Sequence, residues 1–375
     1  MISSVFTAPL QCAESLHLGT LVSLLHADAI HRLRRSCGIE SEHVLLWNVT
    51  GKHAEKAAVS LGLEVSENGC REAVSEFVRR NLEEIASWNI DINAIYRDDE
   101  LKVADLENAL GLLRNQGRLI ECPDGWNMVV DHRRVLGIIE ELPVVPRVRN
   151  KLKQCMTSFP ALYHLHKERV YAVRVTGYEA ISLDPKLCVA LMPTLYGKGG
   201  VLVLGEDVIE RMLLHHLIMS PVGCELAQGV VHGMLLGDDG KKMSRYASNA
   251  VKLGELRVDP DVARASILAR PVSGNMTLES LQTTQARQLR SQFERILGTV
   301  GKRVVVWDFP DPAYHDAVLR LDFQALFQWF RVAINKELRD LVMRIDAGTA
   351  TESEVLRTHV LCTVVGTALF PRTYA

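Results

Sequence analysis

The spacing of apolar positions over the first hundred residues alternates between that of strands and that of helices. Residues 3–9 are rich in β-formers, and residues 21–33 carry apolar side chains near the helical period. HVLLW at 43–47 is typical of a buried strand, whereas 54–63 and 71–88 are typical of helices. The order strand, helix, strand, helix predicts a parallel, doubly wound sheet.

The pattern changes after a helix that we expect at 101–117, which a glycine ends. From 118 to 197 the chain has short strands, many prolines and few long helices, which indicates an insertion. Buried strands return at 199–207 and 229–233, with a helix expected at 208–219 between them. These two strands predict the second half of the same sheet.

From about residue 256 to the end, the pattern is helical. Eight apolar residues are expected close to one helical face: Leu321, Leu326, Trp329, Phe330, Ala333, Leu338, Leu341 and Val342. We therefore predict an α/β protein with a Rossmann-like parallel sheet, split by an insertion and followed by a C-terminal α-helical domain. The expected divisions are 1–117 and 198–255 for the two halves of the sheet domain, 118–197 for the insertion and 256–375 for the helical domain.

Composition narrows the class of protein. Hydrophobic residues make up 47% of the 375, enough for a sizeable core. The longest nearly apolar stretch, VLCTVVGTALF, is shorter than the ~20 residues of a membrane span, and the N-terminus lacks the pattern of a signal peptide. We therefore expect a cytoplasmic protein with no membrane partner. Its eight cysteines form no CxxC pair, and the histidines at 164–166 and 215–216 lack further ligands at metal-site spacing, so we predict no metal site.

The net charge of −2 is not that of a dedicated nucleic-acid binder. Three basic clusters are candidates for a local basic face: HRLRR (31–35), HRRV (132–135) and RVRNKLK (147–153). The commoner alternative is that such clusters are solvated helix faces.

The first segment that carries chemistry is APLQCAESLHLGTL (8–21), in which a strand ends at Pro9 and HLGT opens a helix. The free N–H groups and the dipole at a helix N-terminus favour phosphate. His17 can donate a hydrogen bond to a phosphate, and Gly19 lets a flat base approach the backbone. Taken alone, a lone HxG after a strand is more often ordinary helix-start packing.

The second such segment is GMLLGDDGKKMSRYASN (233–249), which places two lysines and an arginine around a Met-Ser pair in a loop after a strand. Mobile cations in a loop suit a polyphosphate whose charge grows as pyrophosphate departs. The alternative is an exposed basic loop, but KMS in this setting is more specific than HLG.

HLGT and KKMSR, in this order and about 220 residues apart, resemble the two motifs of class I aminoacyl-tRNA synthetases, closest to the methionyl, leucyl, isoleucyl and valyl subgroup. Four further stretches are similar to the same subgroup: LWNVTGKHAEKAA (46–58), LGEDVIERMLLHHL (204–217), VVHGML (230–235) and DPDVARASILARPVSGNMTLES (259–280). Several ordered matches are more specific than any one of them. The resemblance covers roughly residues 5–120 and 198–300, and it implies a Rossmann-like sheet of the HUP type.

The resemblance implies a role for individual positions. His17, Thr20, Lys242 and Arg245 would be catalytic, because they would contact the ATP phosphates and the leaving pyrophosphate. ATP would also contact Pro9, Gly19, Gly205, Glu206, Asp207, His232, Gly233, Met234, Lys241, Met243 and Ser244. The amino acid would contact Ala8, Leu10, Gln11, Trp47 and Asn48. The implied reaction is in-line attack by a carboxylate on the α-phosphorus of ATP, with Mg²⁺ helping to neutralise charge.

Four departures from the family pattern set this chain apart. Thr20 stands where the family's first motif ends in histidine, and KMSRY replaces KMSKS. Asn48 aligns with the aspartate that pairs with the substrate ammonium, so the substrate or its orientation differs. The insertion has no zinc knuckle and is too small for an editing domain, and only about 75 residues follow the helix near 285–300.

Three functions follow from these observations. The favoured one is ATP-dependent activation of an amino acid as its adenylate, with the acyl group passed to a non-tRNA acceptor such as a small amine or hydroxylamine in a biosynthetic pathway. The second is a minimal aminoacyl-tRNA synthetase, in which case tRNA is the partner. The third is a non-catalytic protein that binds ATP or an amino acid as a regulator.

Overall fold

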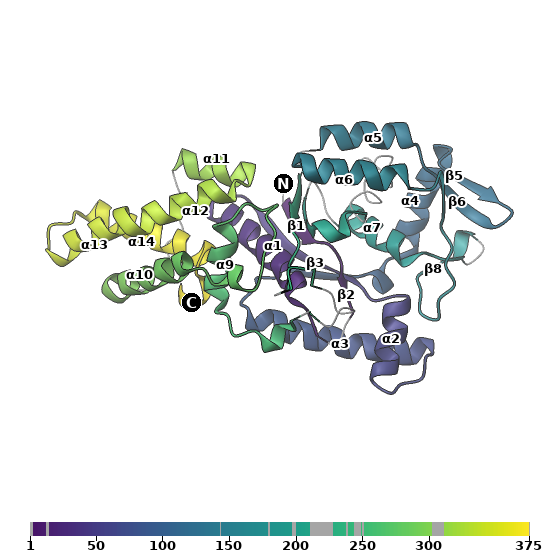
Figure 1. Cartoon of the computed structure of the whole chain (residues 1–375), viewed down its shortest axis with the longest axis horizontal. Coiled ribbons are helices and arrows are strands. Elements are labelled where there is room, and N and C mark those ends of the chain that lie inside the picture. Colours follow the sequence, from purple (N-terminus) through teal and green to yellow (C-terminus); the bar gives the residue numbers. More distant parts are fainter. Residues whose placement is uncertain are drawn as a thin grey trace.

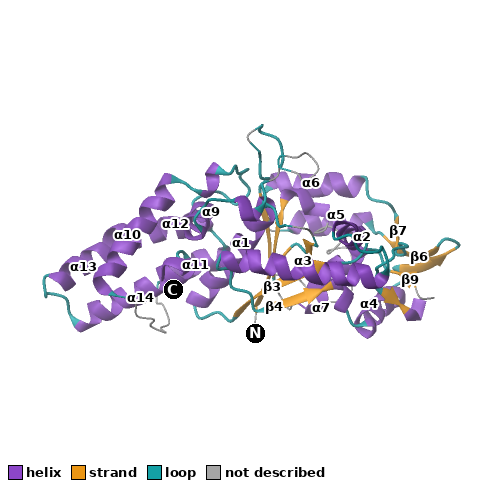
Figure 2. Cartoon of the chain, turned by 90° about the horizontal axis from the view of Figure 1, so that it is seen from below, coloured by secondary structure: helices purple, strands orange, loops and turns teal. Residues whose placement is uncertain are grey.

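The computed structural model describes most of the chain. The described residues are 3–12, 15–142, 144–178, 181–196, 200–210, 228–237, 239–243, 249, 251–301 and 311–374. Figures 1 and 2 show helices α10–α14 at one end of the molecule, the parallel sheet in the middle and the antiparallel strands β5 and β6 at the other end.

A parallel sheet forms the centre, as the sequence predicted. Its order is β11-β10-β1-β3, and both β2 and β4 also pair with β3. The strands are β1 (Ser3–Thr7), β2 (Leu10–Gln11), β3 (Ser41–Asn48), β4 (Ala94–Arg97), β10 (Val201–Gly205) and β11 (Gln228–His232). The sequence pattern did not predict β4, because it is a four-residue edge strand with only half-buried or exposed side chains.

The order of the strands reverses beside β1. From β1 the chain goes to β3 and β4 on one side, and it later returns to the other side for β10 and β11. In such sheets a crevice opens outside the carboxyl ends of the strands at the point of reversal. The topology therefore places the ends of β1 and β10 around a natural binding site.

The helices of the first half match their predicted positions closely. They are α1 (Leu18–Ser36), α2 (Lys52–Ser60), α3 (Glu67–Ser87) and α4 (Val103–Asn115). Gly117 has a φ of +67° just after α4, the left-handed conformation that commonly ends helices. The helix expected at 208–219 lies mostly outside the described residues.

Between β4 and β10, no described strand joins the parallel sheet. An antiparallel sheet is formed by β5 (Leu119–Cys122), β6 (Gly125–Val129) and β7 (Leu162–His164), and β8 (Arg174–Val175) pairs with β9 (Ile181–Ser182). The expectation of few long helices is wrong here: α5 (His132–Glu141), α6 (Pro146–Thr157) and α7 (Pro185–Tyr196) have 10, 12 and 12 residues. The sequence of α6 is mostly polar, so its helical period was not recognised. Its buried residues are Val148, Leu152 and Met156.

The C-terminal part is helical, as predicted. It contains α9 (Pro260–Leu268), α10 (Thr284–Val300), α11 (Pro312–Arg320), α12 (Phe323–Val332), the π-helical segment η7 (Ala333–Leu338), α13 (Arg339–Asp346), α14 (Glu352–Ala368) and α15 (Pro371–Tyr374). Short 3₁₀ turns occur along the chain at η1 (Asp98–Glu100), η2 (Thr176–Tyr178), η3 (Glu206–Val208), η5 (Leu253–Glu255) and η6 (Glu279–Leu281). Among the described helices, none combines the length and apolarity that a membrane crossing needs.

The predicted apolar face near the C-terminus needs one correction. Its members from Leu326 to Val342 follow one another along α12, η7 and α13, and all except Ala333, which is also buried, pack into the same core. Leu321 packs into this core too, but it does not share their helical run, because it ends α11 with a left-handed φ of +52°. The cause is Asp322, whose carboxylate accepts a hydrogen bond from the Ala325 N–H at 3.0 Å and starts a new helix.

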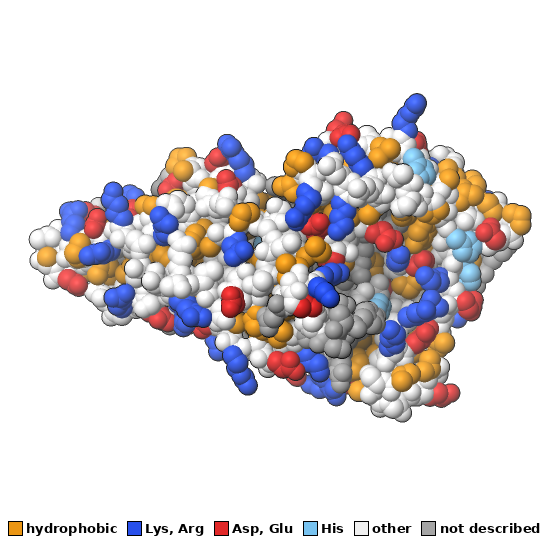
Figure 3. Space-filling model, viewed as in Figure 1, with side chains coloured by type: hydrophobic (Ala, Val, Ile, Leu, Met, Phe, Trp, Pro, Cys, Tyr) orange, Lys and Arg blue, Asp and Glu red, His pale blue; other side chains and the backbone are white. Residues whose placement is uncertain are grey.

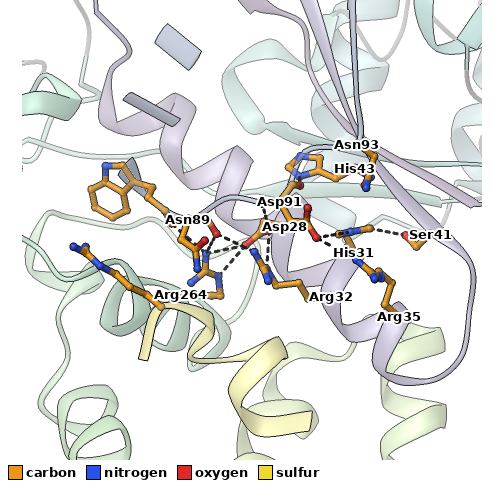
Figure 4. Close-up of polar contacts among 12 residues, drawn as sticks. Asp28, His31, Arg32, Arg35, Ser41, His43, Asn89, Asp91, Asn93 and Arg264 are labelled. Atoms are coloured by element: carbon orange, nitrogen blue, oxygen red, sulfur yellow. Dashed lines mark hydrogen bonds and ion pairs between the residues drawn. The ribbon is translucent and has the colours of Figure 1, made fainter. Parts of the chain in front are cut away.

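In the HRLRR cluster on α1, His31 and Arg32 take part in a polar network inside the protein (Figure 4). Arg32 donates to Asp28 at 2.9 Å, and His31 lies 3.3 Å from Asp91. Asp28 also pairs at 2.8 Å with Arg264 of α9, and both side chains are fully buried. For His31 and Arg32, both a nucleic-acid face and a solvated helix face are wrong, because these side chains pair within the protein with Asp91 and Asp28.

Candidate active site

One cavity of about 770 Å³ lies at the carboxyl ends of the central strands, where the topology predicts it. Residues from both halves of the sheet domain line it. They come from the ends of β1 and β2, the start of α1, one face of α2, the ends of β10 and β11, the KMS segment and Lys252. The cavity thus brings together segments more than 200 residues apart in the sequence.

The HLGT motif forms the first turn of α1, as predicted. His17 is the N-cap, and its Nδ1 accepts a hydrogen bond from the Thr20 N–H at 3.3 Å. The Thr20 hydroxyl lies 3.4 Å from Nε2 of the same ring. A Cβ on Gly19 would come within 3.0 Å of that ring, so the glycine leaves room for the His17 side chain. All three residues line the cavity.

Lys242 reaches the cavity from the KMS segment. The Met243 N–H donates to the Leu235 carbonyl at 2.8 Å, and Lys242 forms an antiparallel bridge with Leu236. The ammonium of Lys242 pairs at 2.9 Å with the carboxylate of Asp207, just after β10. Burial raises the pKa of Asp207, but the hydrogen bond and charge of Lys242 together lower it by more, so the carboxylate stays ionised.

Gly205 sits between these groups and β11. A Cβ there would approach the Asp207 carboxylate to 2.5 Å and the His232 ring to 3.1 Å. Gly205 and Asp207 both line the cavity. Glu206 does not line it, because it turns toward α6, where it pairs with Arg147 and, at 3.5 Å, with Lys151. Of the predicted pair Glu206 and Asp207, only Asp207 reaches the cavity.

His232 ends β11 as a buried, neutral side chain. Its Nδ1 donates to the Gly233 carbonyl at 2.9 Å, and its Nε2 accepts from the Ser23 hydroxyl of α1 at 2.7 Å. Burial lowers the pKa of His232, and its ring stacks on His26 with centroids 5.4 Å apart. This arrangement holds the last residue of β11 against α1.

Gly233 and Met234 follow His232 in the cavity wall. A Cβ on Gly233 would come within 2.2 Å of the Gly274 carbonyl oxygen, so this position requires glycine for backbone packing. The Met234 N–H donates to the Asn275 side chain at 3.1 Å. The turn before Met276 therefore fixes the strand end whose residues the resemblance assigns to ATP.

The residues assigned to the amino acid divide into two groups. Ala8, Leu10 and Gln11 line the cavity, as does Pro9 beside them. Trp47 and Asn48 are not among the lining residues: Trp47 is completely buried in the core, and Asn48 is 6% exposed. Asn48 lies opposite Gln11 in the parallel pairing of β2 and β3. Paired side chains share one face of a sheet, so Asn48 lies beside Gln11 at that part of the wall.

Three further predictions fall outside the cavity or outside the described residues. Lys241 is exposed and does not line the cavity, whereas Met243 does. Ser244 and Arg245 lie outside the residues that the structure describes.

Several lining residues were missed from the sequence. His53, Lys56, Ala57 and Ser60 lie at i, i+3, i+4 and i+7 on α2 and turn one helix face toward the cavity. The signal was present in KHAEKAAVS, where a helical stripe mixes polar and small residues directly after the predicted amino-acid segment. Lys252, beyond the second motif, had no such signal.

Comparisons with known proteins show that the chain has a known fold. No protein-family model matches the sequence, and no curated protein matches it by sequence. Solved structures do match along nearly the whole chain. Mycobacterium tuberculosis methionyl-tRNA synthetase in complex with methionyl-adenylate aligns with a TM-score of 0.70 at 15% identity, covering 99% of this chain and 92% of that chain.

Two further structures agree with this match. A second structure of the same enzyme, bound by methionyl-adenylate, gives a TM-score of 0.67 at 14% identity and covers 100% of this chain and 93% of that one. An arginyl-tRNA synthetase-like protein from Campylobacter jejuni gives 0.61 at 11% identity, with 100% and 92% covered. The chain therefore has the fold of a class I aminoacyl-tRNA synthetase, a Rossmann-like catalytic domain followed by a helical domain, as its HLGT and KKMSR motifs predicted.

Proposed function

We propose that this protein is an adenylate-forming ligase that activates an amino acid with ATP and passes the acyl group to a small non-tRNA acceptor. One observation carries the proposal. The HLGT turn, the Asp207 turn, the end of β11 and Lys242 all line one cavity at the strand ends. Solved structures with this fold are bound to methionyl-adenylate, the product type that such a cavity would make.

In the proposed reaction, a carboxylate oxygen of the amino acid attacks the α-phosphorus of ATP. The new C–O–P link forms as the bond to the β-phosphate oxygen breaks, and pyrophosphate leaves with the electron pair. His17 and the N-terminus of α1 hold the phosphates, and Lys242 stabilises the charge on the departing pyrophosphate. Mg²⁺ bound with ATP would supply further neutralisation of the phosphate charge. Positioning and electrostatics suffice without a covalent enzyme intermediate.

The resemblance assigns the amino end of the substrate to Asn48, which lies beside Gln11 at the cavity wall but does not itself line the cavity. The Asn48 Oδ1 is buried and accepts no hydrogen bond from any described residue. A buried acceptor without a partner is unfavourable, so a donor supplied by the substrate would be stabilising. A neutral amide oxygen accepts a hydrogen bond from an amine without balancing a full charge, which fits a substrate bound differently from an ordinary α-ammonium acid.

The acceptor is proposed to be small because much of the basic surface is already paired within the protein. Besides the α1 network, Arg147 and Lys151 of α6 pair with Glu206, and Lys153 pairs with Glu140. A tRNA partner needs many unpaired cations along its phosphate backbone. The acyl-adenylate, by contrast, reacts with any held amine or hydroxylamine: the nitrogen attacks the acyl carbon and AMP leaves.

A minimal aminoacyl-tRNA synthetase is the second candidate. It is supported by the helical part from α10 to α14, since the alignment with the methionyl enzyme extends over it. The acceptor alone separates the two candidates, because both begin with the same activation step.

Exchange of labelled pyrophosphate into ATP tests the activation step. The protein is incubated with ATP, Mg²⁺ and single amino acids, including hydroxylated and non-protein ones, and we expect exchange with one or a few of them. Lys242→Ala should lower the exchange kcat about 100-fold or more, with a smaller effect on ATP affinity. Binding of ATP without exchange would indicate a regulator, and neither binding nor exchange would overturn the proposed function.

A further inference from the structure

Lys252 follows Lys242 by ten residues in the sequence. In the structure it lies directly opposite His17. The Leu18 N–H donates to the Val251 carbonyl at 3.2 Å, and the Leu253 N–H donates to the Leu16 carbonyl at 2.9 Å. His17 and Lys252 thus face each other in an isolated antiparallel bridge. Side chains of directly opposite residues point to the same side of such a pair, and both of these line the cavity.

The backbone under Lys252 is held from both sides. The neighbouring Leu253 is 2% exposed and packs in the same core cluster as Leu16. On the other side of the HLGT loop, the Glu84 carboxylate accepts from the Leu16 N–H at 2.9 Å and from the Ser15 hydroxyl at 2.7 Å. The position of Lys252 relative to His17 is therefore fixed, while its side chain remains exposed at the cavity.

The two cavity lysines near the motifs differ in their partners. Lys242 is paired with Asp207, the one carboxylate among the described lining residues. Within the described part of the chain, the Lys252 ammonium has no ion pair or hydrogen bond. The cavity thus holds a second cation beside His17 whose charge is not already neutralised.

We propose that Lys252 binds the terminal phosphates of ATP, as an anchored cation beside His17, and so sets the affinity for the triphosphate before Lys242 acts in the transition state. This inference rests on the proposed use of ATP and adds to it a residue outside both motifs. The N-terminus of α1 reinforces the same site, because the positive end of the helix dipole favours the anion that Lys252 attracts.

Lys252→Ala tests the assignment, with Lys252→Arg as the charge-preserving variant and Lys102→Ala, an exposed lysine outside the cavity, as the control. The affinities for a non-hydrolysable ATP analogue, for pyrophosphate and for AMP are measured by calorimetry, and the thermal midpoint confirms folding. We expect Lys252→Ala to weaken the ATP analogue and pyrophosphate about 10-fold or more, as for loss of one charge-assisted contact. AMP binding should be unchanged, because AMP lacks the terminal phosphates.

The outcomes separate the two proposals. Unchanged affinity of Lys252→Ala for the ATP analogue, in a wild-type protein that binds it, overturns the role of Lys252 and leaves the proposed function standing. An equal loss for AMP would show that Lys252 only shapes the loop, which also overturns it. A wild-type protein that binds no ATP analogue would remove the proposed function itself.

Discussion

At the scale of single residues, the site depends on the absence of side chains as much as on their presence. Gly19 leaves room for the His17 ring, Gly205 for Asp207, and Gly233 for the backbone at Gly274. None of these three has a positive φ, so each glycine is required by close approach rather than by backbone conformation. Gly19 is the position of the three where an added Cβ would meet only a functional side chain, that of His17.

Gly19→Ala should lower activity without lowering stability. The new Cβ lies 3.0 Å from the His17 ring and must displace it, so we expect the kcat for pyrophosphate exchange to fall about 10-fold or more. Alanine is the better helix former by up to about 1 kcal/mol, so urea unfolding should show equal or higher stability. Gly111→Ala in α4 is the matched control, since a Cβ there meets nothing within 4 Å. If both variants kept full activity, the role of His17 would be wrong.

Asp98 should make the stability depend on pH. It is buried and accepts hydrogen bonds from the Val49 N–H and the Thr50 hydroxyl, but burial raises its pKa to about 7. The unfolded chain loses this proton near pH 4, whereas the native state keeps it until about pH 7. Between these values the native state binds more protons, so the free energy of unfolding falls as pH rises, by at most about 1.4 kcal/mol per unit.

Asp98→Asn removes the titrating group and should flatten this fall, although the loss of one hydrogen bond lowers stability at pH 5. Urea unfolding at several pH values between 4 and 8 measures the slope, and the exposed Asp340→Asn serves as the control. An undiminished slope in Asp98→Asn would assign the pH dependence to other groups.

At the scale of elements, α1 connects the site to the rest of the molecule. Its first turn carries His17, its middle holds His232 through Ser23, and its last turns carry the polar network of Figure 4. Asp28 is the centre of that network. Burial raises its pKa, but the charges of Arg264 and Arg32 lower it by more, so a buried carboxylate is kept ionised by two guanidinium groups.

Arg264→Met should destabilise the protein by about 3 kcal/mol or more, because it leaves the buried Asp28 carboxylate with one guanidinium and the Asp91 N–H as partners. A second substitution, Asp28→Leu, should recover much of this loss by removing the uncompensated charge. Arg290→Met is the control, since Arg290 and its partners Asp259 and Glu294 are partly exposed. Equal effects of Arg264→Met and Arg290→Met in urea unfolding would contradict a special role for the buried pair.

At the scale of the whole molecule, charge is distributed rather than gathered. Figure 3 shows Lys and Arg side chains interspersed with Asp and Glu over the visible face, and the net charge is −2. Long-range attraction of a polyanion requires an excess of one sign. The molecule thus has the fold of a class I aminoacyl-tRNA synthetase without an overall excess of positive charge.

We therefore predict weak, strongly salt-dependent binding of tRNA and no stable aminoacyl-tRNA. Total tRNA, ATP and the activated amino acid are incubated with the protein at moderate salt, and acid-stable acyl-tRNA is measured, with an authentic methionyl-tRNA synthetase as the positive control. Candidate amines and hydroxylamines are added in parallel, and the right one should accelerate AMP release. Efficient charging of one tRNA species would instead establish the minimal synthetase.

The sequence by itself determined the parallel sheet, the helical C-terminal part and most of the cavity wall. Strand and helix periods are local, so β1, β3, β10 and β11 could be predicted from short windows. His17, Gly19 and Lys242 were identified for a related reason: each belongs to a short motif whose residues work together through neighbouring backbone.

Tertiary structure decided which residues far apart in the sequence come into contact, because no short window of sequence contains both partners. The pairing of Lys242 with Asp207, the bridge between His17 and Lys252, and the turn of Glu206 toward α6 join residues far apart in the chain. The inward position of His31 in the HRLRR cluster has the same origin, because its partner Asp91 lies 60 residues further along the chain. Local patterns fix which elements form, whereas the partners of charged and buried polar groups depend on how those elements pack.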